Sequence, residues 1–227
     1  MEKKIYSVAV DGPSGAGKST LAKAIASKLG IVYVDTGAIY RSIGYYVYCK
    51  NIDPKDAPAV IAILPELDIQ MCYGEDGVQR MILNGEDVSS QIRLPEMSMY
   101  ASAVSAIPEV RTFLLEMQRQ MARRTSVIMD GRDIGTVVLP DAQVKIFLTA
   151  AAEVRAHRRM KELEQRGTPQ PFDEVLQQIQ ERDWADSHRA AAPLCQAEDA
   201  VLVDTSELDF EQSLEKLLAI ICGRVGL

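Results

Sequence analysis

The feature that most constrains this chain is a glycine-rich segment at residues 12–19, which matches the pattern GxxxxGK[ST] in full. It lies between an apolar run at residues 5–10 and a helical pattern at residues 18–29, the context that the motif requires. Glycines let the backbone wrap closely around a polyphosphate, and the converging amides and the helix N-terminus attract its charge. The segment therefore predicts binding of a nucleoside triphosphate, because a chance glycine-rich turn would not satisfy both pattern and context.

The residues expected to hold the nucleoside triphosphate are Gly12, Pro13, Ser14, Gly15, Ala16, Gly17, Lys18, Ser19 and Thr20. Within this set we expect Lys18 to bridge the β- and γ-phosphates and the Ser19 hydroxyl to ligate Mg²⁺. The motif does not name the group that receives the phosphate.

Short apolar runs rich in β-branched residues predict buried parallel strands. They lie at residues 5–10, 31–35, 126–130, 143–149 and 200–204. We expect a three-layer α/β fold of the P-loop kinase type, with a five-stranded parallel sheet and helices on both faces. Most of these runs end on aspartate, and ligands of such sheets bind outside the carboxyl ends of the strands.

Residues 63–95 break this pattern and predict a small antiparallel β insert. Two arms at residues 67–73 and 78–83 flank a turn at 74–77, and Asn84-Gly85 is a further turn signal. The predicted domains are therefore a kinase core, residues 1–62 and 96–227, and an insert, residues 63–95.

Several helices are predicted later in the chain. They cover residues 108–124, 151–164, 172–191 and 209–225, and the first has an apolar stripe that includes Phe113. The loop at 165–171 joins two of them, and we expect residues 151–191 to form a helical lid.

Composition excludes several function classes. The net charge is −7, which gives no general attraction to nucleic acid or acidic membranes. The four cysteines show no metal-ligand or CxxC spacing, which favours reduced cytosolic thiols. We expect a cytoplasmic monomer without nucleic-acid or membrane partners.

The positions of the arginines indicate what kind of group accepts the phosphate. A hydroxyl acceptor needs a general base, whereas a nucleotide phosphate is mostly dianionic at neutral pH and needs cations instead. Arginines cluster after strands and on the lid helices: Arg41, Arg132, Arg155, Arg158, Arg159, Arg182 and Arg189. Arg182 and Arg189 are seven residues apart, so we expect both on one face of the same helix. The chain also lacks the Asn-Lys-x-Asp of regulatory GTPases.

The motifs together resemble those of the bacterial cytidylate kinases, within the nucleoside monophosphate kinase family. The matching segments are residues 11–18, 35–41, 85–89, 130–136, 144–148, 155–159, 181–183 and 189–193, which span nearly the whole chain. The resemblance implies transfer of phosphate from ATP to CMP or dCMP. It also implies roles for individual residues.

By this resemblance, Thr36, Tyr40 and Arg41 would hold the acceptor nucleotide, and Ser102, Arg111 and Asp133 would read the cytosine. Asp186 and Arg189 would reach the sugar. Arg132, Arg158 and Arg182 would line the transferring phosphoryl group. Thr36 departs from the serine common in the family but keeps the hydroxyl. Kinases for other small acceptors, and a nucleotide-gated binding protein, remain as alternatives.

Overall fold

The computed structural model describes residues 5–74, 78–165 and 167–227. The chain divides into two compact units, Met1–Val34 with Arg119–Leu227, and Asp35–Gln118. The division predicted from the sequence, residues 1–62 and 96–227 against 63–95, rests on strand pattern and stays a prediction. Within these described residues, each helix is too short or too polar to span a membrane.

The first unit is built on a five-stranded sheet in the order β2-β6-β1-β7-β8. The strands are β1 Ser7–Asp11, β2 Val32–Asp35, β6 Val127–Gly131, β7 Val144–Thr149 and β8 Val201–Asp204. β1 lies parallel to both β6 and β7, and β7 lies parallel to β8. The predicted strands and the α/β fold class are confirmed, because short β-branched runs suit a sheet buried on both faces.

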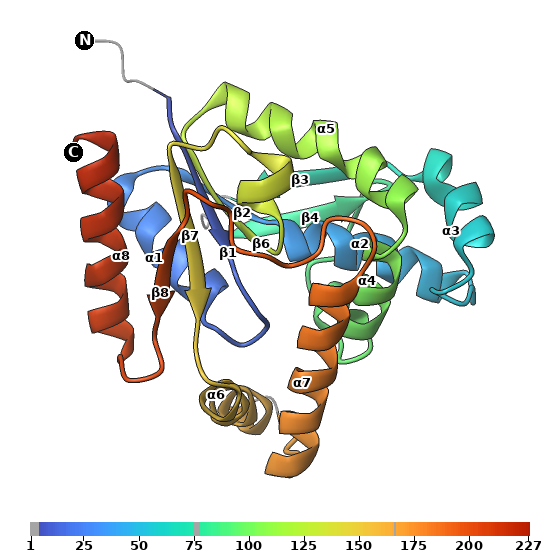
Figure 1. Ribbon diagram of the computed structural model, residues 1–227. Coiled ribbons are helices and arrows are strands. Elements are labelled where there is room, and N and C mark those ends of the chain that lie inside the picture. The colour runs from blue at the N-terminus through green and yellow to red at the C-terminus, as the bar shows by residue number, and fades with distance from the viewer. Residues whose placement is uncertain (1–4, 75–77, 166) are drawn as a thin grey trace. The chain divides into compact units, whose positions relative to one another are not determined.

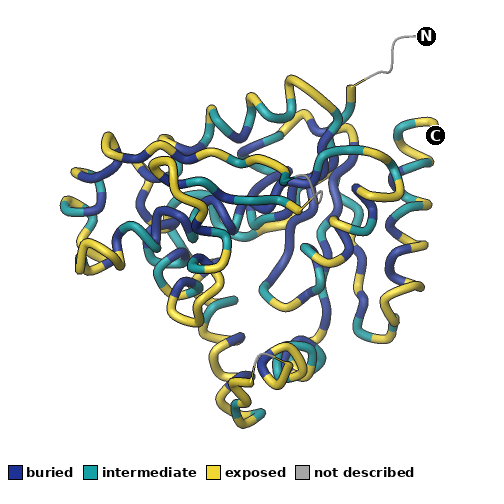
Figure 2. Tube along the Cα trace, turned by 180° about the vertical axis from the view of Figure 1, so that it is seen from behind, coloured by how far each residue is buried: buried dark blue, intermediate teal, exposed yellow. Residues whose placement is uncertain are grey.

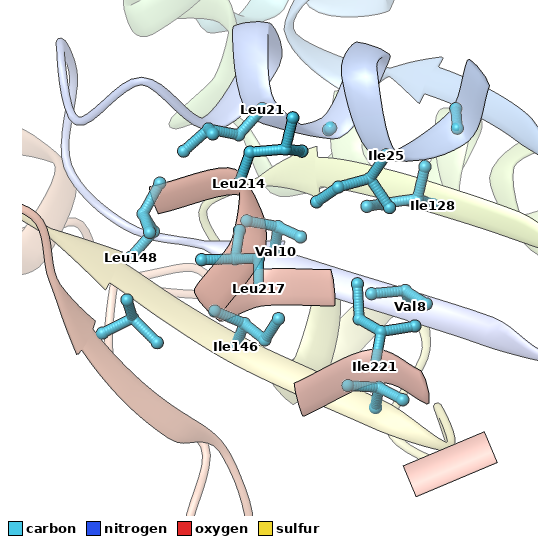
Figure 3. Packing of buried hydrophobic residues seen from close by; sticks show 14 of the residues in the cluster. Val8, Val10, Leu21, Ile25, Ile128, Ile146, Leu148, Leu214, Leu217 and Ile221 are labelled. Atoms are coloured by element: carbon cyan, nitrogen blue, oxygen red, sulfur yellow. The ribbon is translucent and has the colours of Figure 1, made fainter. Parts of the chain in front are cut away.

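One face of this sheet is covered by α1 (Lys18–Leu29) and α8 (Phe210–Val225) (Figure 1). Val10 and Ile146 of the sheet lie in one apolar cluster with Ile25 of α1 and Leu217 of α8 (Figure 3). α8 is buried along one side and exposed along the other, as an amphipathic helix should be (Figure 2). This core fixes the strand β1 that carries the glycine-rich loop.

The opposite face carries a short π-helical turn, η3 (Ile134–Val138), which the sequence did not predict. Gly135 of η3 lies close to the Lys145 side chain on β7. Arg119, near the end of α5 (Pro108–Arg124), donates hydrogen bonds to the carbonyls of Val137 and Val138, at 2.9 and 3.0 Å. The turn is thus held against the sheet directly after the strand end at residues 130–133.

The predicted lid consists of α6 (Ala152–Gln165) and α7 (Phe172–His188), which pack on each other through Leu163, Val175 and Ile179. Residue 166 of the predicted loop lies outside the described residues. α7 ends at His188, not at residue 191. Arg189 turns into an extended conformation and its Nε donates to the Ala192 carbonyl at 2.7 Å. The prediction that Arg182 and Arg189 share a helix face was therefore wrong.

The second unit contains a three-stranded antiparallel sheet in the order β3-β4-β5. Its elements are α2 Thr36–Cys49, α3 Ala57–Ile63, η1 Leu64–Glu66, β3 Ile69–Tyr73, β4 Gln79–Leu83, β5 Glu86–Asp87, η2 Gln91–Arg93 and α4 Met97–Ser105, followed by most of α5. Gly74 donates its amide to the Val78 carbonyl at 3.0 Å; the predicted turn residues 75–77 lie outside the described part of the chain. Phe113, expected in the apolar stripe of α5, is 38 % exposed.

Candidate active site

The loop at residues 12–17 leaves β1 and enters α1, as the motif predicts. Gly12, Gly15 and Gly17 have φ angles of 146°, 76° and 90°, a region that side-chain-bearing residues rarely adopt. A Cβ on Gly12 would lie 1.9 Å from the Leu148 carbonyl oxygen. Glycine is therefore required there by both backbone conformation and space.

Lys18 is buried at the base of this loop. Its Nζ donates to the Pro13 carbonyl oxygen at 2.7 Å. Burial, together with the nearby positive charge of Arg132 and Arg182, holds the pKa of Lys18 well below its ordinary value. The carboxylates of Asp130 and Asp11 offset only part of this shift, so the buried cation is electrostatically unfavourable until an anion arrives. The site is therefore built to receive a highly charged anion.

Ser19 and Asp130 form a pair of oxygen donors beside the loop. Ser19 Oγ donates to Asp130 Oδ2 at 2.7 Å, and Tyr33 Oη donates to Asp130 Oδ1 at 2.8 Å. Hydroxyl and carboxylate oxygens are the ligands that Mg²⁺ prefers, so these residues fit the metal. Sequence reasoning did not include Asp130 in the site, although its position at the end of a strand was a usable signal.

Asp11, the last residue of β1, links the loop to the turn that follows β6. Its Oδ1 accepts from the Ile134 amide at 2.8 Å, and its Oδ2 accepts from the Gly135 amide at 2.7 Å. Burial raises the pKa of Asp11 to about 6, although the two amides oppose the shift. Asp11 was not predicted as a site residue either.

Three predicted arginines gather around two buried carboxylates. Arg132 Nε donates to Asp186 Oδ2 at 2.6 Å, and Arg182 Nε lies 4.0 Å from the same oxygen. Arg189 Nη2 lies 3.3 Å from Asp133 Oδ1. Burial alone would raise the pKa of Asp186, but Arg132 and Arg182 outweigh it and lower that pKa. The structure thus brings these predicted residues together.

Arg158 lies elsewhere in the unit. Its guanidinium donates to the Thr205 carbonyl at 2.8 Å and to the Ala16 carbonyl at 3.4 Å. Arg155, one turn earlier on α6, is buried and donates to the Ser14 carbonyl at 3.0 Å. The predicted contact of Arg158 with the transferring phosphoryl group stays a prediction.

The second unit carries the other predicted acceptor residues. Arg41 Nη2 lies 3.0 Å from Asp35 Oδ2, and Asp35 also caps α2, where Thr36 is buried in the first turn. The Arg111 guanidinium lies over the Tyr40 ring, 5.5 Å from its centroid.

Arg111 Nη1 also donates to the Ser105 carbonyl at 3.1 Å. Ser102 lies one turn before Ser105 on α4 and accepts from its hydroxyl at 2.9 Å. Within this unit, Arg111 therefore links the residues at the start of α2, through Tyr40, to those between α4 and α5.

Known proteins resemble this chain over almost its whole length. The family model described as "Cytidylate kinase" matches residues 8–222. The chain is 51 % identical over 218 residues to the cytidylate kinase of Caldicellulosiruptor bescii, covering 96 % of each chain. It is 48 % identical over 217 residues to that of Fervidobacterium nodosum, again covering 96 % of each.

A solved structure shares the fold at much lower identity. The crystal structure of an uncharacterised protein from Eubacterium ventriosum has a TM-score of 0.53 and 14 % identity, covering 97 % of this chain and 100 % of that one. This likeness concerns the fold alone.

Proposed function

Because the chain belongs to the cytidylate kinase family, we propose that it transfers the γ-phosphoryl group of ATP to CMP and dCMP, giving CDP and dCDP. The observation that carries the proposal is the gathering of buried Lys18 with Arg132 and Arg182 beside a complete phosphate loop. Such a concentration of cations suits the approach of two nucleotides that repel each other.

In this mechanism the loop amides and Lys18 hold the β- and γ-phosphates of ATP. Mg²⁺, held by Ser19 and by Asp130, would neutralise charge on the phosphates when bound. Arg132 and Arg182, with Arg158, stabilise the negative charge of the phosphoryl group while it is transferred. The acceptor phosphate has a second pKa of about 6, so it attacks as a dianion and needs no general base. Transfer is in line and direct.

The acceptor is recognised by its phosphate, sugar and base. Thr36, Tyr40 and Arg41 hold the nucleotide, and Asp186 and Arg189 reach the sugar. The cytosine is read by Ser102, Arg111 and Asp133. A carboxylate accepts from the exocyclic amine of cytosine, whereas uracil has a carbonyl at that position. This chemistry gives the preference for cytidine nucleotides.

Three further properties belong to the same proposal. α6 and α7 act as a lid that closes over both substrates and excludes water, which suppresses ATP hydrolysis. The enzyme works as a cytoplasmic monomer. It has no nucleic-acid or membrane partner, consistent with its net charge of −7.

The proposal is tested by incubating the protein with ATP, Mg²⁺ and one acceptor at a time while ADP release is followed. The acceptors are CMP, dCMP, UMP, AMP and a small set of alcohols and sugars. We expect rapid ADP release with CMP and dCMP and only slow release without acceptor. Release that is independent of the acceptor would contradict the proposal, and a preference for AMP or an alcohol would reassign the substrate.

A further inference from the structure

Two carbonyl oxygens of the phosphate loop are bound by arginines of α6. Arg155 Nη1 donates to Ser14 O at 3.0 Å, and Arg158 Nη1 lies 3.4 Å from Ala16 O. Each of these carbonyls belongs to the peptide group that precedes a glycine, Gly15 or Gly17. The contacts therefore bear on the orientation of two peptide groups within the loop.

In a trans peptide group the carbonyl oxygen and the amide hydrogen point in opposite directions. A bond that fixes Ser14 O on the α6 side therefore directs the Gly15 amide away from α6. Gly15 and Gly17 adopt φ angles of 76° and 90°. Glycine samples several backbone conformations at similar energy, so these peptide groups would rotate readily without an external restraint.

Arg155 is itself held rigidly. Its side chain is 6 % exposed, and its three guanidinium nitrogens each contact a different group. Nε donates to the Ala150 carbonyl at 2.8 Å, and Nη2 lies 2.7 Å from Asp183 Oδ2 on α7. A planar guanidinium with all its sides engaged is pre-organised, unlike a lysine ammonium at the end of a flexible chain. The backbone and Cβ of Arg155 also pack on Gly15. A Cβ added to Gly15 would lie 3.1 Å from Arg155 Cβ.

We propose that Arg155 is a positioning residue of the phosphate loop, which fixes the Ser14–Gly15 peptide so that its amide is available to the nucleotide phosphates, and that Asp183 on α7 holds Arg155 in place. This inference rests on the proposed function only in taking residues 12–19 as the ATP site. It assigns Arg155 to the loop backbone instead of to a transferred phosphate, and it links the lid helix α7 to the conformation of the loop.

The test uses nucleotide affinity, which does not require phosphoryl transfer. Dissociation constants for ADP and for ATP are measured by calorimetry with Mg²⁺ and without acceptor, and thermal melting is recorded for every variant. Arg155→Lys keeps the charge but cannot reach three acceptors. We expect its affinity for ADP and for ATP to fall equally, by about tenfold, because both nucleotides carry the phosphates that the loop wraps.

Arg159→Lys is the matched control on the same helix, because Arg159 is one-third exposed and its guanidinium pairs with Glu162, one turn along α6, at 3.0 Å. We expect it to bind both nucleotides as the unchanged protein does. Asp183→Asn keeps the shape but weakens the anchor of Arg155, so it should reduce both affinities in the same direction by a smaller factor. It also keeps the test valid if Arg155→Lys does not fold.

Two results would overturn the proposal. Unchanged affinities with a lower melting temperature would make Arg155 a merely structural residue. A loss for ATP with ADP binding retained would mean that Arg155 contacts the γ-phosphate directly. If the unmodified protein binds ADP but moves no phosphate to CMP, the proposed function fails while the ADP comparison still decides the role of Arg155.

Discussion

Asp133 and Arg189 form a buried ion pair across 56 residues of sequence, with Arg189 Nη2 3.3 Å from Asp133 Oδ1 and side chains 7 % and 6 % exposed for the arginine and the aspartate. Asp133 precedes the π-helical turn η3, and Arg189 follows the end of α7. The pair therefore ties the turn after β6 to the chain that follows α7. Both residues belong to the proposed acceptor site.

Replacing Asp133 with alanine removes the proposed acceptor for the cytosine amine and leaves Arg189 without this partner. We expect KM for CMP to rise by about tenfold or more, because a lost hydrogen bond to a charged group is expensive in a buried site. KM for ATP should change by no more than a few-fold. Steady-state kinetics with each substrate varied in turn checks this, with exposed Asp141→Ala as the control. An equal rise in both KM values would remove Asp133 from base recognition.

Lys18 offers a test of the phosphate loop itself. We expect Lys18→Ala to lower kcat by about a thousandfold, since it removes a preorganised charge aimed at the transferring group. The melting temperature should stay the same or rise, because a buried lysine among arginines with a depressed pKa does not stabilise the empty protein. Turnover within a few-fold of the unmodified enzyme would show that Lys18 is not the phosphate-binding lysine.

The pair Ser19–Asp130 makes the metal dependence measurable. In Asp130→Asn the oxygen that accepts from Ser19 loses its charge, so we expect the Mg²⁺ concentration for half-maximal activity to rise by about 10- to 100-fold. Tyr33→Phe removes the hydrogen bond from Tyr33 Oη to this carboxylate but keeps the carboxylate charge, so it should shift the value less. Activity at saturating Mg²⁺ should recover in large part. A Mg²⁺ requirement unchanged in Asp130→Asn would contradict the assignment.

The parts of the fold set by local pattern could be predicted from the sequence. The helix α1 begins at Lys18 and ends before Gly30, whose φ of 63° explains why glycine ends it. The five strands could also be predicted from the sequence, because buried parallel strands are continuous apolar runs.

What the sequence missed depends on partners distant in the chain. The end of α7 was misplaced because Arg189 leaves the helix to donate to Ala192 and to pair with Asp133. Asp11 and Asp130 looked like ordinary strand ends, and only the fold shows that one receives the η3 amides and the other Ser19. The phosphoryl role of Arg158 came from the family resemblance and stays a prediction, whereas its contacts with the carbonyls of Ala16 and Thr205 could be found only in the fold.

The carboxyl group of Asp11 should make the stability of this protein depend on pH in an unusual direction. Burial raises its pKa from the ordinary 3.8 to about 6, so the folded chain binds this proton more tightly than the unfolded chain. The stabilisation is therefore complete below about pH 4 and is lost as pH rises through about 6. Between about pH 5 and pH 7.5 the loss is on the order of 1 kcal/mol. The free energy of unfolding in urea is measured for the unmodified protein and for Asp11→Asn at both pH values. The difference between the two proteins isolates the contribution of Asp11, because the contributions of the other titrating groups cancel. Asp11→Asn, which cannot titrate, should gain about that much relative to the unmodified protein at the higher pH. Parallel pH dependence of the two would show that Asp11 is ionised throughout, with both η3 amides keeping its carboxylate charged.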